Sequence, residues 1–189
     1  MTIKEIAENK VDKNPDYDPM SKLIEESGNK SATTYSAVGY WVEKGVGLRA
    51  ALIEEVYDQA NLSTESIINN LSNLVKKIRE IHKLPVSNGY IDSAEQLIIK
   101  SMRNKVVLNI HGSRKRKIID RIRVVDFLFS SGKFVIFENC KETIVGFNGA
   151  VWDPKANKEN RLDNGTTNID SLDATEYTLE QHFTDFLGV

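Results

Sequence analysis

The chain contains 189 residues, 40% of them hydrophobic and 28% charged, and it carries a formal net charge of −2 at pH 7. Such a chain is typical of one soluble globular domain, and its balanced charge excludes a globally basic surface for nucleic acid. Cys140 is the single cysteine, which excludes an intrachain disulfide and a cysteine-rich metal site and favours a reducing compartment. Residues 1–13 are polar and charged, so we expect no signal peptide, and no apolar run has transmembrane length.

Residues 1–21 are polar, contain two prolines and show no clear apolar period. We interpret them as a tail or linker remnant and place the folded domain at residues 22–189. This domain opens with a short apolar and acidic segment that reads as the end of a strand. The segment ends at Glu25 and Glu26, shortly before a Gly-Asn turn.

Two strands and a helix are predicted next. Residues 34–43 and 48–57 are rich in strand-forming side chains, and the glycine-containing residues 44–47 between them predict an antiparallel hairpin. A helix then starts near Leu62 and ends at Pro85. Its apolar stripe, which we expect to pack into the core, consists of Ile67, Ile68, Leu71, Leu74, Val75, Ile78 and Ile81.

Asp92 stands where a short apolar run ends and helical spacing begins. The preceding helix returns the chain to this run, which predicts a crossover onto a parallel strand. Ser93 and Gln96 have the spacing of a capping box, so the next helix is expected to start directly after Asp92. Its predicted apolar face consists of Ala94, Leu97, Ile98 and Met102. Asp92 either caps this helix or lies at the rim of the sheet, where open α/β folds place ligands.

The second half of the chain continues the alternation of strands and helices. A strand is predicted at residues 106–110, and a helix that stops at Gly132 follows the basic run 114–117. The inward face predicted for this helix consists of Ile118, Ile119, Ile122, Val125 and Phe129. Residues 134–137 predict a strand, and residues 142–152 predict a weaker helix that two glycines interrupt.

A polar loop at residues 154–167 leads to a last helix, which Asp170 is expected to cap. This helix is predicted to pack through Leu172, Leu179, Phe183 and Phe186. The order of strands and helices predicts a mixed α/β sheet flanked by helices. Because the long strands come first and a crossover follows, a ribonuclease H-like arrangement is favoured over a doubly wound one.

Acidic residues occur at three equivalent places: Glu25 and Glu26, Asp92, and Asp170 with Asp173. The last two stand three positions apart on a helix and so share a face. Carboxylates that converge without Arg or Lys between them repel one another unless cations separate them, and Mg²⁺ prefers such oxygen ligands. Two ions about 3.5–4 Å apart can stabilise the attacking and leaving oxygens of phosphodiester cleavage. Alternatively, these acidic residues serve separately as helix caps and solvated surface residues. For the three acidic places taken together, we favour a metal site.

Residues 89–95 have the sequence Gly-Tyr-Ile-Asp-Ser-Ala-Glu. This segment resembles the central acidic motif in the carboxy-terminal nuclease domain of bacteriophage terminase large subunits. The similarity continues through residues 120–140, 151–153 and 168–177, the last of which resembles the family's final motif. Residues 25–34 resemble the first motif. The motifs are short, but their order and spacing together are specific.

The resemblance implies a ribonuclease H-like fold that cuts double-stranded DNA with two Mg²⁺ or Mn²⁺ ions. It implies activity during packaging of concatemeric phage genomes, in the cytoplasm of an infected or lysogenic bacterial host. The implied partners are DNA, the terminase small subunit, the packaging ATPase domain and the portal, with no membrane. No Gly-x-x-x-x-Gly-Lys-Ser/Thr phosphate-binding loop occurs in the sequence, so we expect an isolated nuclease domain or the product of a split or degraded gene.

Carried over by position, Asp92 and Asp173 match metal-binding carboxylates, and Asp170 falls where some members have a histidine. Glu25 and Glu26 both stand near the place where the first motif usually has an aspartate, and the alignment does not choose between them. The expected catalytic set is thus one of these glutamates with Asp92 and Asp173. The extra methylene of a glutamate can weaken activity, so a non-catalytic module that binds DNA or docks on packaging components is the alternative.

The basic run Arg114, Lys115, Arg116 and Lys117 stands at the start of a predicted helix. These side chains are candidates for contacts with DNA phosphates. A solvated basic turn with no specific partner is the equally weighted alternative.

Overall fold

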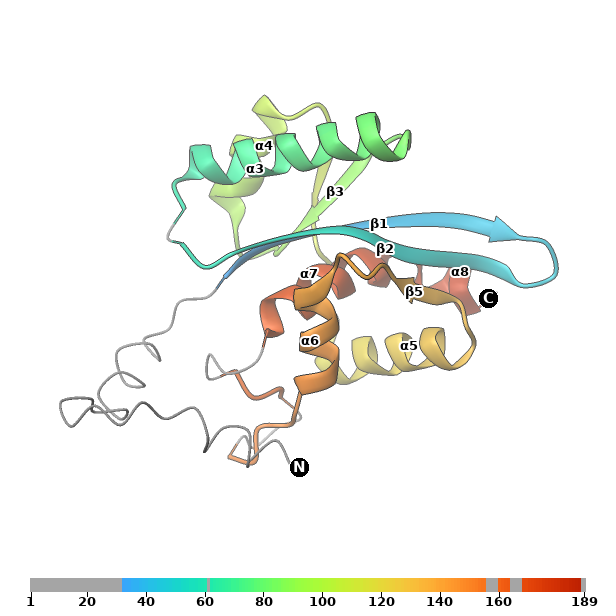
Figure 1. Ribbon diagram of the computed structural model, residues 1–189. Coiled ribbons are helices and arrows are strands. Elements are labelled where there is room, and N and C mark those ends of the chain that lie inside the picture. The colour runs from blue at the N-terminus through green and yellow to red at the C-terminus, as the bar shows by residue number, and fades with distance from the viewer. Residues whose placement is uncertain (1–31, 61, 156–159, 164–167, 188–189) are drawn as a thin grey trace, which may run out of the picture.

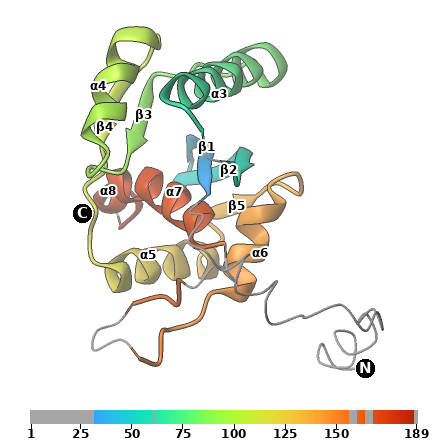
Figure 2. The same ribbon diagram turned by 90° about the vertical axis from the view of Figure 1, so that its left-hand side faces the viewer.

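The computed structural model describes residues 32–60, 62–155, 160–163 and 168–187. Its strands span Thr33–Glu43 (β1), Gly47–Asp58 (β2), Asn88–Ile91 (β3), Asn109–Gly112 (β4) and Phe134–Ile136 (β5). Its α-helices span Thr64–Lys77 (α3), Gln96–Lys105 (α4), Ile118–Ser130 (α5), Lys141–Gly149 (α6), Ile169–Leu179 (α7) and Phe183–Leu187 (α8). A sheet with the order β1-β2-β5 crosses the middle of the molecule, with β3, β4, α3 and α4 above it and α5 to α8 below (Figure 1). Viewed from the side, α7 lies beneath β1 and above α5 (Figure 2).

The hairpin of β1 and β2 confirms the two strands predicted from the sequence. The strands pair antiparallel, from Thr33 opposite Asp58 to Glu43 opposite Gly47. Gly45 and Gly47 adopt φ angles of 83° and 96° in the connection, which glycine reaches without the steric cost of a Cβ atom. Strand β5 then pairs parallel with β2, so the sheet is mixed.

Strand β2 is buried on both faces and lies at the centre of the core. Because side chains alternate along a strand, Ala50 and Leu52 pack with the helices below, whereas Ala51 and Ile53 pack toward α3. The main cluster below the sheet also contains Val124, Val125, Leu128, Phe134, Cys140, Leu179, Phe183 and Phe186. The sheet therefore separates two apolar layers, which fixes the helices on its two sides.

Helix α3 begins with a side-chain cap, because the Ser63 hydroxyl accepts the Ser66 N–H at 3.1 Å. The helix continues as a π-helical turn, Ile78–His82. It ends at Lys83, which has a left-handed backbone conformation with a φ of 57° and stands two residues before Pro85. The predicted apolar stripe lies in the core at Ile68, Leu74, Val75 and Ile78, although Ile81 at its end is exposed. The helix therefore covers the upper face of the hairpin.

The start of α4 corrects the capping box predicted for it. The Asp92 carboxylate accepts the Ala94 N–H at 2.9 Å, which makes a local turn, and the helix begins only at Gln96. The Gln96 side chain donates to the Ser93 carbonyl, and no side chain caps the helix. Short aspartate side chains compete with helix initiation in this way, so the turn delays the helix.

The buried faces of α4 and α5 also differ from those predicted. Helix α4 buries Ile99, whereas the predicted Leu97 is 82% exposed. Helix α5 buries Leu128 and Arg121, whereas the predicted Phe129 is 41% exposed. Both helices carry apolar residues on more than one face, so periodicity alone could not select the face that packs.

The last predicted helix is divided in the structure. Helix α7 is followed by a 3₁₀ turn, Glu180–His182, and then by α8. The sequence predicted Asp170 as the N-cap of this helix, but Asn168 occupies that position. The Asp170 carboxylate instead accepts the Ala32 N–H at 2.8 Å. The predicted packing side chains are buried, namely Leu172, Leu179, Phe183 and Phe186.

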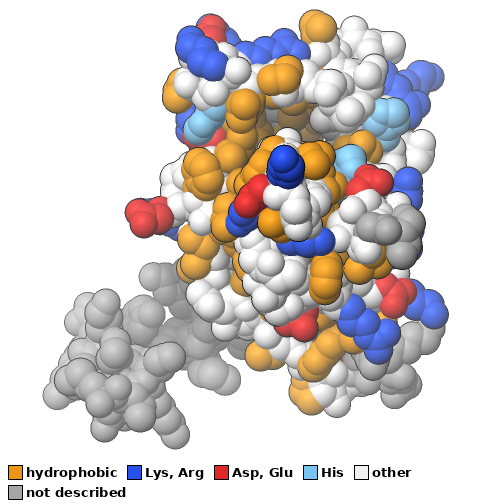
Figure 3. Space-filling view, turned by 90° about the vertical axis from the view of Figure 1, so that its right-hand side faces the viewer, with side chains coloured by type: hydrophobic (Ala, Val, Ile, Leu, Met, Phe, Trp, Pro, Cys, Tyr) orange, Lys and Arg blue, Asp and Glu red, His pale blue; other side chains and the backbone are white. Residues whose placement is uncertain are grey.

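The mixed α/β sheet flanked by helices, which was predicted from the sequence, is confirmed. Strands β3 and β4 pair parallel with each other, and within the described residues they do not pair with β1. The face on which the hairpin ends mixes hydrophobic, basic and acidic side chains (Figure 3). In the described part of the chain, every helix is too short or too polar to cross a membrane.

Candidate functional site

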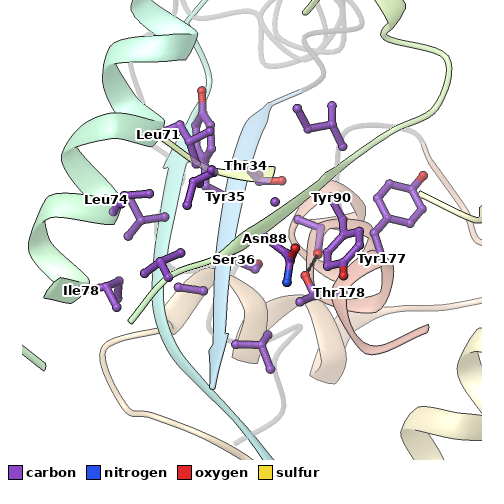
Figure 4. Close-up of a pocket in the computed structure, with 18 of the residues that line it drawn as sticks. Thr34, Tyr35, Ser36, Leu71, Leu74, Ile78, Asn88, Tyr90, Tyr177 and Thr178 are labelled. Atoms are coloured by element: carbon purple, nitrogen blue, oxygen red, sulfur yellow. Dashed lines mark hydrogen bonds between the residues drawn. The ribbon is translucent and has the colours of Figure 1, made fainter. Parts of the chain in front are cut away.

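A cavity of about 950 Å³ lies between β1 and β3. Helix α3 borders it on one side through Leu71 and Leu74, and α7 borders it on the other through Tyr177 and Thr178 (Figure 4). Among the described residues, β1 and β3 are edge strands of their sheets, so the cavity lies where two sheet edges meet. Strand β3 brings its carboxyl end, with Asp92, to this cavity.

Asp92 is held by several groups at once. Its Oδ1 accepts the Ala94 N–H at 2.9 Å, and its Oδ2 lies 3.3 Å from the Tyr177 hydroxyl, which donates to it. The Lys115 ammonium group donates to both oxygens, at 3.0 and 2.9 Å. Partial burial opposes ionisation, but these donors and the Lys115 charge outweigh it and hold the pKa of Asp92 below its ordinary value.

Helix α7 places Asp170 and Asp173 at the same cavity, as their spacing predicted. Asp170 ties α7 to the start of β1: its carboxylate accepts the Ala32 N–H, and its backbone carbonyl accepts the Thr34 hydroxyl at 2.8 Å. The Asp173 side chain is 31% exposed and accepts Arg121 Nη1 at 2.9 Å and Arg161 Nη1 at 3.3 Å. Burial raises the pKa of Asp173 and nearby Asp170 adds to this, although the two guanidinium groups oppose it.

Beneath Asp173 lies a buried ion network. Arg161 donates to the Glu176 carboxylate through both of its terminal nitrogens, Nη1 and Nη2. Arg121 Nη1 lies 3.2 Å from Glu176 Oε2. The side chains of Arg121 and Glu176 are 3% and 0% exposed. Burial raises the pKa of Glu176, against the effect of its two arginine partners. The arginines come from α5 and from the segment before α7, so the network ties these elements to α7.

Tyr177 stands between the two parts of the site. Burial raises the pKa of its hydroxyl, and the charges of Asp173 and Asp92 raise it further. The Arg121 guanidinium lies 5.1 Å from the centre of its ring. The charges of Asp92 and Asp173 therefore both act on the Tyr177 hydroxyl, although the two residues come from elements far apart in sequence.

The predicted basic run forms the connection from β4 to α5. Arg114 and Lys117 are exposed, and within the described residues their side chains have no polar partner. Lys115 bonds to Asp92, and the Arg116 guanidinium lies 4.9 Å from the centre of the Phe183 ring. The backbone N–H groups of Lys115 and Arg116 donate to the Glu180 carboxylate at 2.9 and 3.1 Å. The run is therefore an anchored loop next to Asp92.

The donor set of this cavity has the chemistry of a site for a hard cation, because carboxylate oxygens are what Mg²⁺ and Mn²⁺ prefer. Asp92, Asp170 and Asp173 all line the cavity. Within the described residues, however, no group of three or more acidic, histidine or cysteine side chains is close enough to enclose an ion. Glu25 and Glu26 lie outside the described residues. The charge environment also differs from the one expected, because Lys115, Arg121 and Arg161 lie among the carboxylates.

Sequence reasoning did not anticipate Arg121, Arg161 or Glu180. Arg121 stands on the inward face of α5 between apolar residues, and a charged residue at such a position is a sign of a buried ion pair. Arg161 and Glu180 carry no such signal, because their partners are set by tertiary packing.

Searches of family models and of curated proteins found no match. A search of solved structures did find similar folds. The large terminase of a thermophilic bacteriophage shares 20% identity and a TM-score of 0.63, over 82% of this chain and 37% of that one. The nuclease domain of the large terminase g2p from bacteriophage SPP1, solved with bound Mn, shares 16% identity and a TM-score of 0.56, over 81% of this chain and 80% of that one.

These likenesses establish the fold. The chain has the ribonuclease H-like α/β fold of a nuclease domain. More particularly, it has the fold of the nuclease domain of phage large terminases, which confirms at the level of the fold the resemblance seen in the motifs. The chain spans little more than a third of the thermophilic phage protein, 37% of its length.

Proposed function

We propose that this chain is a metal-dependent DNA endonuclease domain of a phage DNA-packaging terminase, which cuts double-stranded concatemeric DNA. One observation carries the proposal: Asp92 and Asp173, from separate elements, line one cavity together with Tyr177, whose hydroxyl donates to Asp92. The shared fold supports it, since the SPP1 nuclease domain was solved with bound Mn. Residues 22–189 are proposed as the nuclease domain and residues 1–21 as a tail.

Asp92 and Asp173 would hold Mg²⁺ or Mn²⁺, with Asp170 as a further ligand. Two ions held there would supply an activated water and would stabilise charge on the leaving oxygen. Glu25 or Glu26 is proposed as the additional carboxylate. Ala32 lines the cavity and bonds to Asp170.

The chain's own side chains have distinct proposed roles at this site. The Tyr177 hydroxyl and the Ala94 N–H orient the Asp92 carboxylate. Arg121 and Arg161 fix the Asp173 side chain from below. Arg114 and Lys117, exposed on the neighbouring loop, are proposed to contact DNA phosphates.

The wider context is also a proposal. In a terminase, this domain would act in the bacterial host cytoplasm with a packaging ATPase domain, the small subunit and the portal. The large terminase of the thermophilic phage has also been solved with ATP-gamma-S, and this chain matches 38% of that protein. The unmatched part of that protein is consistent with further domains in the thermophilic phage terminase.

Nicking of supercoiled plasmid tests the proposal. We expect weak nicking with Mn²⁺, less with Mg²⁺ because its coordination geometry is stricter, and none with Ca²⁺. Asp92→Asn should abolish nicking in either metal. Asp126→Asn, which removes an exposed carboxylate of α5, serves as the matched control and should retain it. Nicking that survives Asp92→Asn at the wild-type rate would contradict the assignment of the site.

The alternative is a non-catalytic nuclease-like module that binds DNA or docks on packaging components. The three basic side chains among the carboxylates favour it, because they already neutralise Asp92 and Asp173. Under this alternative, the chain binds DNA with an affinity that falls steeply with salt, yet never nicks it in Mn²⁺.

A further inference from the structure

The loop from β4 to α5 is anchored at two points beside Asp92. The Ser113 N–H donates to the carbonyl of Ile91, the last residue of β3, at 2.7 Å. Glu180, which is 0% exposed, accepts the backbone N–H groups of Lys115 and Arg116. A buried carboxylate without these donors would be costly, so the Glu180 contact strongly favours this loop conformation. The positive φ of Lys115, 50°, is held by the same contact.

Within the described residues, Asp92 is the one polar partner of the Lys115 side chain, in contrast to its backbone. Its ammonium group bridges both Asp92 oxygens, and the side chain is 49% exposed. An ion pair of this exposure contributes little to stability, so a competing cation can replace it at small cost. The anchored backbone would then keep the released ammonium group at the mouth of the cavity.

We propose that Lys115 is an exchangeable counter-ion of Asp92, which a divalent cation displaces and which then binds a DNA phosphate. The inference rests on the proposed function and adds a regulatory property to the same site: cation binding and DNA binding favour each other through one side chain. Linkage is reciprocal, so DNA must raise the affinity for the cation by the same factor as the cation raises the affinity for DNA. Glu180 is the positioning residue of this device.

The first arm of the test measures Mn²⁺ affinity by calorimetry without DNA. Lys115→Met removes the competing ammonium group and should tighten Mn²⁺ binding about two- to fivefold, the range of an exposed ion pair. Arg114→Met is the matched control, because it makes the same charge change in the same loop at an exposed residue that has no polar contact with Asp92 within the described residues. It should leave Mn²⁺ affinity close to that of the wild type.

The second arm measures the affinity for a short fluorescein-labelled DNA duplex by anisotropy, with and without Ca²⁺, which is not expected to support cleavage. The wild type should gain at least about fivefold from the cation, the lower range of allosteric coupling. Lys115→Met should lose most of this cation-induced gain in DNA affinity, whereas Lys115→Arg should keep it. Arg114→Met should bind DNA more weakly than the wild type but should show the same gain with the cation. Glu180→Gln, checked by circular dichroism to be folded, should reduce the gain while Lys115 is still present.

The outcomes separate this inference from the proposed function. Unchanged or weaker Mn²⁺ binding by Lys115→Met, or a full cation-induced gain in its DNA affinity, overturns the role of Lys115 and leaves the metal site standing. Absence of Mn²⁺ binding by the wild type overturns both. A loss of coupling in Arg114→Met equal to that in Lys115→Met would show that general loop charge is responsible, and this too overturns the inference.

Discussion

Asp92 and Asp173, two of the carboxylates that line the cavity, are held in opposite ways. Asp92 bonds to the exposed Lys115 ammonium group, and its pKa lies below the ordinary value. Asp173 bonds to Arg121 and Arg161, whose side chains are 3% and 6% exposed, and its pKa lies above the ordinary value. A solvated single lysine can move away from its partner, whereas two buried guanidinium groups cannot move without leaving Glu176 unpaired.

This difference indicates a division of labour within one site. The Asp173 side belongs to the core of the domain, since its partners also fasten α5 and the segment before α7 to α7. The Asp92 side is adjustable, since only a side chain must move to change its partner. A cation that enters the cavity should therefore exchange the Asp92 partner and retain those of Asp173.

The largest expected effect comes from breaking the rigid side. Arg121→Met should destabilise the fold by about 3–5 kcal/mol, because it removes one of the two arginines that neutralise Asp173 and the buried Glu176 and leaves only Arg161 from the described network. Urea unfolding measures this free energy. Arg123→Met on the same helix is the control: its side chain is 71% exposed and lies 3.8 Å from Asp120, so the change should remain within about 0.5 kcal/mol. Equal effects of the two substitutions would contradict the buried network.

A smaller effect, of opposite sign at the two carboxylates, should appear in the pH dependence of stability. The pKa of Asp92 is lowered from 3.8. Its stabilising contribution to the free energy of unfolding is therefore present above pH 3.8 and is lost as the pH falls through the folded-state pKa. The pKa of Asp173 is raised from 3.8, so its contribution is present below that pH and is lost as the pH rises through the folded-state pKa.

Unfolding free energies of the wild type, Asp92→Asn and Asp173→Asn across acidic pH measure these contributions. The advantage of the wild type over Asp92→Asn should shrink on acidification, from at most about 1 kcal/mol. The difference between the wild type and Asp173→Asn should change in the other direction. The same slope for both variants would rule out the contrast between the two sides.

Much of the fold was predictable because local patterns and packing agree. The alternating strand formers of β1 and β2 and the apolar stripe of α3 each point to the elements that form. The start of α4 was not predictable in the same way, because the Asp92 carboxylate makes a turn with Ala94 that competes with the capping box. Such local competition is expected where a side chain also serves a site.

The convergence of Asp92 with Asp170 and Asp173 on one cavity also followed from the sequence, through strand-end position and helical spacing. Their basic partners did not, since Lys115 and Arg161 reach the site through loops whose path depends on tertiary contacts. The roles of Glu25, Glu26 and the other site residues stay predictions.

Mn²⁺ binding measured by calorimetry tests the central claim most directly, because it needs neither DNA nor catalysis. The account predicts that the wild type binds Mn²⁺ and that Asp92→Asn and Asp173→Asn each weaken binding by about tenfold or more, as expected for loss of a charged ligand that a hard cation prefers. Asp126→Asn should bind like the wild type. Wild-type affinity in both Asp92→Asn and Asp173→Asn would show that the two carboxylates do not form a shared cation site.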